Sequence, residues 1–195
     1  MSTTGVTMSV VPTPPERIER LERWPMSLAE YLALPEGVRA EYVNGEAVVT
    51  PPATSGHNKA QRRIANAIEA GLAEAVDVRT ESGWAFGELH RIPDVAVFAH
   101  KDDVVFDANV PILVVEVLSP STASEDTVRK ATEYLAAGIS QYWIVDRAEP
   151  SLIVYGNNGQ GWDRVAVLDA DNLSATITVG AWGEVSLDLL ALLRP

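Results

Sequence analysis

The sequence contains no cysteine, which excludes disulfide bonds and thiolate metal sites. It also lacks an apolar run of the roughly 18–20 residues that a membrane-spanning helix requires. The N-terminus lacks the charged region and the following apolar region of a signal peptide. We therefore expect a soluble, cytoplasmic protein that has no membrane partner.

Basic residues are scarce. The chain has 15 lysines and arginines against 27 aspartates and glutamates, which gives a net charge of −12 at pH 7. This balance counts against a general nucleic-acid-binding protein, because such proteins usually carry a basic surface. It leaves open a local basic patch, or an acidic site that approaches phosphate through a bound metal ion.

The length of 195 residues suits one domain with a short appendage, and a hydrophobic fraction of 47% provides ample material for a core. We predict that residues 1–24 form a flexible tail, in which Glu16–Arg23 could form a short charged helix. Residues 25–195 are predicted to form a single domain.

The stretch Ile112–Ser119 predicts the central strand of the fold. It is rich in β-branched residues and shows no alternation of polar with apolar residues, which is typical of a strand covered on both faces. Glu116 lies in the middle of this stretch. Because burying an unpaired carboxylate costs several kcal/mol, Glu116 must be paired, protonated, bound to a metal or at an open site.

The order of the remaining segments predicts an α/β fold, in which a mixed β-sheet is flanked by helices. The unit from Ile112 to Asp146 should be a right-handed crossover between two parallel strands. Local capping and turn signals support this interpretation. They are a capping box at Ser27 and Glu30, a type I′ turn at Asn44-Gly45, a helix cap at Ser55, and a capping box at Thr122 and Glu125 before a helix that ends at Gly138.

Two carboxylates are candidates for one shared site. Asp94 begins the predicted strand Ile92–Phe98, and Glu116 lies in the next strong strand. If these strands are neighbours, the two carboxylates converge at one end of the sheet. Together with Glu41 and the carbonyl of Val117, they would suit Mg²⁺ or Mn²⁺. The competing interpretation is structural, with Asp94 at a strand start and Glu116 in a buried salt bridge.

Lys130 is the cation that such a site would need. It falls on the helix after the Glu116 strand, where its long stem could reach the strand ends, and Tyr134 lies one turn further on. The alternative is a solvated lysine that pairs with Asp126. His57, at the start of a helix, could orient a phosphate or a water molecule, or could simply have a structural role there.

Several segments resemble the Uma2 family, a bacterial family described as "putative restriction endonuclease". The resemblance runs from about Met26 to the C-terminus. Glu41, Gly45 and His57 match the N-terminal pattern of that family. The segments that carry the rest of the resemblance are Pro93-Asp94, Val115–Thr122, Lys130, Tyr134, Ala137–Ile139 and Tyr142–Asp146.

The family is placed in the PD-(D/E)XK nuclease-like superfamily, so the resemblance implies a restriction-endonuclease-like α/β core and metal-assisted hydrolysis of DNA. Asp94 and Glu116 match the two acids of the motif. The lysine expected two residues after Glu116 is missing, because that position holds Leu118. The resemblance implies that Lys130 takes its place and stabilises developing negative charge or orients a water molecule. Asp94, Glu116 and the Val117 carbonyl would hold Mg²⁺ or Mn²⁺.

The resemblance also matches Glu41 to an additional catalytic acid, and we expect His57 and Tyr134 to bind substrate. A degenerate nuclease fold that binds or scaffolds without cleaving is the alternative. The implied partner is DNA, which the protein could reach through a targeting partner, and analogy with the superfamily favours a homodimer.

Overall fold

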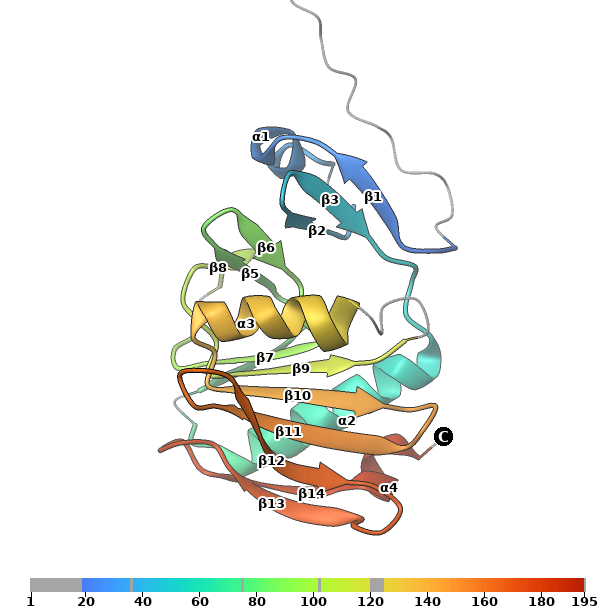
Figure 1. The fold of residues 1–195 in the computed structure, drawn as a ribbon, viewed down its shortest axis with the longest axis vertical. Coiled ribbons are helices and arrows are strands. Elements are labelled where there is room, and N and C mark those ends of the chain that lie inside the picture. The colour runs from blue at the N-terminus through green and yellow to red at the C-terminus, as the bar shows by residue number, and fades with distance from the viewer. Residues whose placement is uncertain (1–18, 36, 75, 102, 120–124, 195) are drawn as a thin grey trace, which may run out of the picture.

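A six-stranded mixed sheet forms the centre of the computed structural model, which describes residues 19–35, 37–74, 76–101, 103–119 and 125–194 (Figure 1). The strand order is β12-β11-β10-β9-β7-β4. Strands β9 and β10 are parallel, as the predicted crossover requires, and their other neighbours are antiparallel. The six strands are β4 (Asp77–Thr80), β7 (Val95–Phe98), β9 (Leu113–Val117), β10 (Gln141–Asp146), β11 (Ser151–Asn157) and β12 (Trp162–Leu168).

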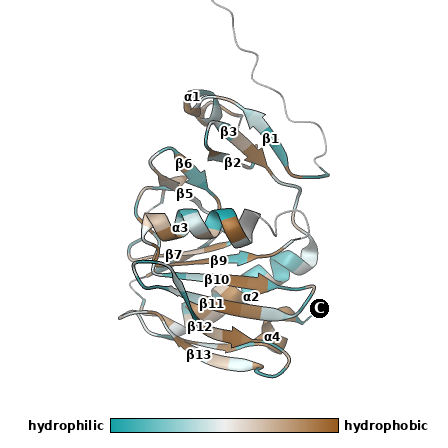
Figure 2. Ribbon diagram, viewed as in Figure 1, coloured by the Kyte–Doolittle hydropathy of each residue, from teal (hydrophilic) through white to brown (hydrophobic). Residues whose placement is uncertain are grey.

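Helices cover both faces of this sheet. Helix α2 (Ser55–Gly71) covers one face, where its Ile64 and Val115 of β9 belong to the same core cluster. Helix α3 (Ala131–Ala137), which continues a π-helix over Glu125–Lys130, packs against the opposite face. Every residue of β9 is buried, because alternate side chains point to opposite helices. Figure 2 shows the resulting hydrophobic strands between helices that carry both hydrophobic and hydrophilic residues.

A second six-stranded sheet lies beyond α3 and has the order β1-β3-β2-β6-β5-β8. Its β2–β3 hairpin turns at Asn44 and Gly45, whose φ angles of 52° and 83° fit the predicted type I′ turn. A two-stranded sheet and α4 complete the chain. These elements are β1 (Glu22–Pro25), α1 (Leu28–Leu32), β2 (Ala40–Val43), β3 (Glu46–Val49), β5 (Gly83–Phe86), β6 (Leu89–Arg91), β8 (Phe106–Asp107), β13 (Ser174–Thr178), β14 (Glu184–Asp188) and α4 (Leu189–Leu193).

The N-terminal segment differs from its prediction. Residues Glu22–Pro25 form β1, which pairs with β3, so a tail that runs to residue 24 and a helix that runs to Arg23 are both wrong for this part of the chain. The charge pattern suggested a helix, but the open edge of the hairpin supplies backbone partners, and Arg23 pairs with Glu46 at 3.3 Å. Tertiary pairing has outweighed local propensity.

The predicted helix ends are confirmed in part. The capping box at Ser27 and Glu30 is present, and Gly138 ends α3 in the left-handed conformation with φ of 83°. Helix α2 is capped by Thr54, one residue before the predicted Ser55, through a bond from the N–H of His57 to the threonine hydroxyl. Thr122 lies outside the described residues.

Within the described residues, no helix is both long enough and apolar enough to cross a membrane.

Candidate active site

Asp94 immediately precedes β7, and Glu116 lies on the neighbouring strand β9. Val95 of β7 pairs with Val115 of β9 in antiparallel register, so the next position along each strand sets Asp94 opposite Glu116. Both residues are buried, with exposed fractions of 7% and 3%, and both line the same cleft. The predicted convergence of these two acids is confirmed.

The carboxylate of Asp94 is fixed from two sides. Its Oδ1 accepts a hydrogen bond of 3.0 Å from Nε2 of His57, and its Oδ2 accepts one of 2.7 Å from the N–H of Val117. Gln61, one turn after His57 on α2, donates to the backbone carbonyl of Asp94 at 2.8 Å. The start of α2 therefore orients Asp94 toward the end of β9.

The carboxylate of Glu116 is held by two side chains of the following helical segment. Its Oε1 accepts from Nζ of Lys130 at 3.0 Å and from the hydroxyl of Tyr134 at 2.7 Å. Burial, with the nearby Glu116 and Glu41 charges, raises the pKa of Tyr134 well above 10, so the hydroxyl stays protonated and donates. Residues 130 and 134 share a helix face, which brings both donors to one oxygen.

The side chain of Tyr134 has no exposed surface. This placement does not favour the predicted contact between Tyr134 and substrate, because a fully buried side chain cannot reach a molecule in the cleft. Its hydroxyl instead positions Glu116. Tyr134 thus belongs to the site through its contact with the acid.

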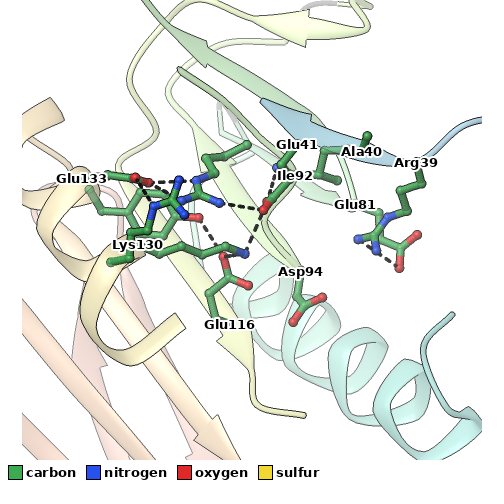
Figure 3. A network of polar contacts seen from close by, with 12 residues as sticks. Arg39, Ala40, Glu41, Glu81, Ile92, Asp94, Glu116, Lys130 and Glu133 are labelled. Carbon is green, nitrogen blue, oxygen red and sulfur yellow. Dashed lines mark hydrogen bonds and ion pairs between the residues drawn. The ribbon is translucent and has the colours of Figure 1, made fainter. Parts of the chain in front are cut away.

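Lys130 joins the two sheets. Its ammonium lies 3.0 Å from Glu116 and 3.3 Å from Oε1 of Glu41, which comes from β2 in the second sheet (Figure 3). Only 6% of the residue is exposed. The interpretation of Lys130 as a solvated lysine is wrong, and the lysine reaches the Glu116 strand from the helix, as the displaced motif required.

Glu41 is the centre of a buried ionic network. Besides Lys130, it accepts from Nη1 of Arg91 at 2.8 Å and from the N–H of Ile92 at 2.9 Å. Burial would raise the pKa of Glu41, but the charges of Lys130 and Arg91 and these hydrogen bonds outweigh it and lower the pKa to about 2. Glu41 is therefore ionised at neutral pH.

Arg91 was not predicted from the sequence. It is fully buried, and it bridges Glu41 to Glu133, whose Oε2 accepts from Nη2 at 2.6 Å. Burial opposes its charge, but Glu41 and the other neighbours raise the pKa of Arg91 above its usual value. The signal in the sequence was an arginine two residues before the Pro93-Asp94 pair. Buried acids need a cation as partner, and arginine stays charged when it is buried.

The network borders a cleft of about 320 Å³. Its walls come from β2 and the loop after β3, from the start of α2, and from the ends of β9 and β10. Leu118 adds an apolar side to it. The predicted site residues Glu41, His57, Asp94 and Glu116 all line this cleft, as does Lys130.

The donor atoms of the cleft fit a hard divalent cation. Asp94 and Glu116 supply carboxylate oxygens, and the carbonyl of Val117 points to the same strand edge as its N–H, which faces Asp94. No group of three or more His, Asp or Glu side chains arranged for a metal occurs in the described residues.

The comparisons with known proteins identify the family and support the fold. A family model described as "Uma2: Putative restriction endonuclease" matches residues 28–189. The chain belongs to the Uma2 family. No curated protein matches this sequence. The predicted family is therefore confirmed over most of the chain.

A solved structure supports the fold of this Uma2 protein. The chain is similar to a protein from Anabaena variabilis ATCC 29413, titled a "putative nuclease belonging to DUF820", with a TM-score of 0.73 and 23% sequence identity. The match covers 87% of this chain and 98% of the other. The predicted α/β fold, a mixed sheet flanked by helices, is confirmed.

Proposed function

We propose that this Uma2 protein is a nuclease that uses Mg²⁺ or Mn²⁺ to hydrolyse phosphodiester bonds of DNA. The observation that carries the proposal is the position of Lys130, whose ammonium lies 3.0 Å from Glu116 although the motif position at Leu118 is apolar. A lysine beside two convergent acids is the set of groups that phosphodiester hydrolysis uses.

In this proposal, Asp94, Glu116 and the Val117 carbonyl hold the cation. When bound, the cation supplies Lewis-acid activation of the phosphate and of the attacking water. His57 and the Val117 N–H fix Asp94, and Tyr134 fixes Glu116, so that neither carboxylate has to reorganise during the reaction.

The ammonium of Lys130 would donate a hydrogen bond to the phosphate oxygen on which negative charge develops. The oxygen of a water molecule forms a bond to phosphorus, and the bond from phosphorus to the leaving oxygen breaks. One proton of that water ends on the leaving oxygen, which gives a hydroxyl and a phosphate monoester. Glu41 keeps the ammonium of Lys130 directed at the cleft through the 3.3 Å contact.

The alternative is a binding or scaffolding protein with an inactive nuclease fold. The same network is compatible with this alternative, because the contact between Lys130 and Glu116 could serve as a structural ion pair without a catalytic role. A cleavage assay separates the two functions.

The test is plasmid nicking with Mg²⁺ or Mn²⁺ by the wild type and by two variants, Asp94→Asn and Lys130→Gln. Each variant should lose at least about 100-fold in rate, because each removes a group that acts in the transition state. Asp171→Asn is the matched control, since Asp171 is exposed and does not line the cleft. Equal nicking by all four proteins would indicate a contaminating nuclease, and binding without nicking would favour the alternative.

A further inference from the structure

We propose that Arg147 is a substrate-binding residue, whose guanidinium contacts a phosphate next to the one that reacts. The proposal rests on the proposed nuclease function and extends it to a residue outside the motif. Arg147 directly follows β10, which runs parallel to β9, so it lies at the same sheet edge as Glu116 and Val117. It lines the same cleft.

The guanidinium lies against the first turn of α2. A Cβ atom built at Gly56 would overlap with Nη2 of Arg147 and would lie 2.9 Å from its Cζ. Gly56 immediately precedes His57, the residue that fixes Asp94. Because Gly56 has no side chain, the guanidinium of Arg147 has space beside it. Arg147 therefore lies next to the residue that precedes His57, the partner of Asp94.

Arg147 differs from the other cations of the cleft in its pairing with the described residues. The other long cations that line the cleft are already paired, Lys130 with Glu116 and Glu41, and Arg39 with Glu81 at 3.7 Å. For Arg147 no ion pair or side-chain hydrogen bond occurs within the part of the chain that the structure describes.

The substrate needs such a group because acids outnumber the other cations that line the cleft. Glu19, Glu41, Asp94 and Glu116 line it, and an approaching polyanion would be repelled. A planar guanidinium can bind two oxygens of a phosphate at once, which is why arginine is favoured at phosphate contacts. The N-terminal end of the α2 dipole adds positive potential beside it.

The experiment measures binding and cleavage separately. Fluorescence anisotropy with a labelled duplex oligonucleotide and with the single strand, in Ca²⁺ and over a series of salt concentrations, gives the affinity and its salt dependence. Nicking in Mg²⁺ is measured on the same proteins. The variants are Arg147→Gln and Arg147→Lys, and Arg164→Gln is the matched control, because Arg164 is exposed on β12 and outside the cleft.

We expect Arg147→Gln to weaken binding about tenfold, which is the usual effect of one charged hydrogen bond. The slope of log affinity against log salt should fall by about one, as for the loss of one phosphate contact. Arg147→Lys should keep that slope and lose part of the affinity. Arg164→Gln should match the wild type, and thermal unfolding of all variants should be unchanged.

The proposal would be overturned if Arg147→Gln bound with the affinity and the salt slope of the wild type. It would also be overturned if Arg164→Gln lost as much affinity as Arg147→Gln, or if the wild type bound neither probe. The same experiment distinguishes failure of the proposed nuclease function from failure of the Arg147 proposal. If the wild type binds but does not nick, the nuclease function fails, while the salt slope still decides whether Arg147 contacts phosphate.

Discussion

Replacing Glu41 by glutamine should destabilise the protein by about 3 kcal/mol at pH 7. The carboxylate is buried and accepts from Lys130, Arg91 and the N–H of Ile92. Its pKa is lowered from 4.5 to about 2. At about 1.36 kcal/mol per unit this shift corresponds to about 3 kcal/mol, which agrees with the roughly 3–5 kcal/mol lost when one partner of a buried ion pair is removed.

The sign of the pH dependence follows from the direction of the shift. A carboxylate with a lowered pKa in the folded state contributes its full stability above pH 4.5 and loses it as the pH falls through about 2. The difference between wild type and Glu41→Gln should therefore be about 3 kcal/mol at pH 7 and about 1 kcal/mol at pH 3.

Urea denaturation followed by circular dichroism measures this difference at each pH. The matched control is Glu46→Gln, in the same hairpin. Glu46 pairs with Arg23 at 3.3 Å, but both side chains are about one-third exposed, so this change should cost less than about 1 kcal/mol. The reasoning fails if Glu41→Gln costs no more than Glu46→Gln, or if its cost does not fall between pH 7 and pH 3.

Three further outcomes follow from the structure. Tyr134→Phe removes the 2.7 Å bond to Glu116 and should cost about 1–3 kcal/mol in urea denaturation; a cost near zero would mean that the hydroxyl does not hold the acid. Gly138→Ala forces a side chain into φ of 83° and should cost about 1 kcal/mol, whereas Gly161→Ala, where an added Cβ meets nothing, should be near neutral. About a hundredfold excess of Mn²⁺ over its Kd should raise the Tm of the wild type by about 5–10 °C and leave Asp94→Asn unchanged; equal shifts would place the ion elsewhere.

The acid pair was predictable because it depends only on which strands are neighbours and on their register. Two strong strands close in sequence are usually neighbours, and the register that pairs Val95 with Val115 then sets Asp94 opposite Glu116. The family resemblance supplied the chemical meaning. It also singled out Lys130, whose direction could not be decided from the helix pattern, since the alternative partner Asp126 lies only four residues away.

The rest of the network depends on contacts between distant segments. Arg91 is 50 residues from Glu41 and 42 from Glu133, and no local pattern shows that these three side chains meet. Strand β1 was missed for the same reason, because its pairing with β3 brings together residues such as Arg23 and Glu46, which are 23 positions apart. Buried ion pairs and edge strands depend on which distant segments of the chain pack together. A single sequence does not reveal those contacts.

The charge count of the buried site connects this network to the proposed reaction. Among the described residues at the site, Glu41, Asp94 and Glu116 are buried acids, while Lys130 and Arg91 are buried cations. These five side chains carry one more negative than positive charge. Glu133 also pairs with Arg129, whose positive charge offsets its negative charge, so this pair leaves the count unchanged.

An excess buried charge is costly for a site that is only structural, because desolvation penalises the charged form. A divalent cation would change the excess to one positive charge, and a phosphodiester, with one negative charge, would then neutralise the site. In the proposed function, a bound cation and a bound phosphate would together balance the charge of the buried groups. The substitutions Lys130→Met and Lys130→Gln would increase the negative excess, so each should strengthen Mn²⁺ binding in calorimetry while it reduces cleavage. Weaker Mn²⁺ binding in these variants would contradict the charge argument even if cleavage were lost.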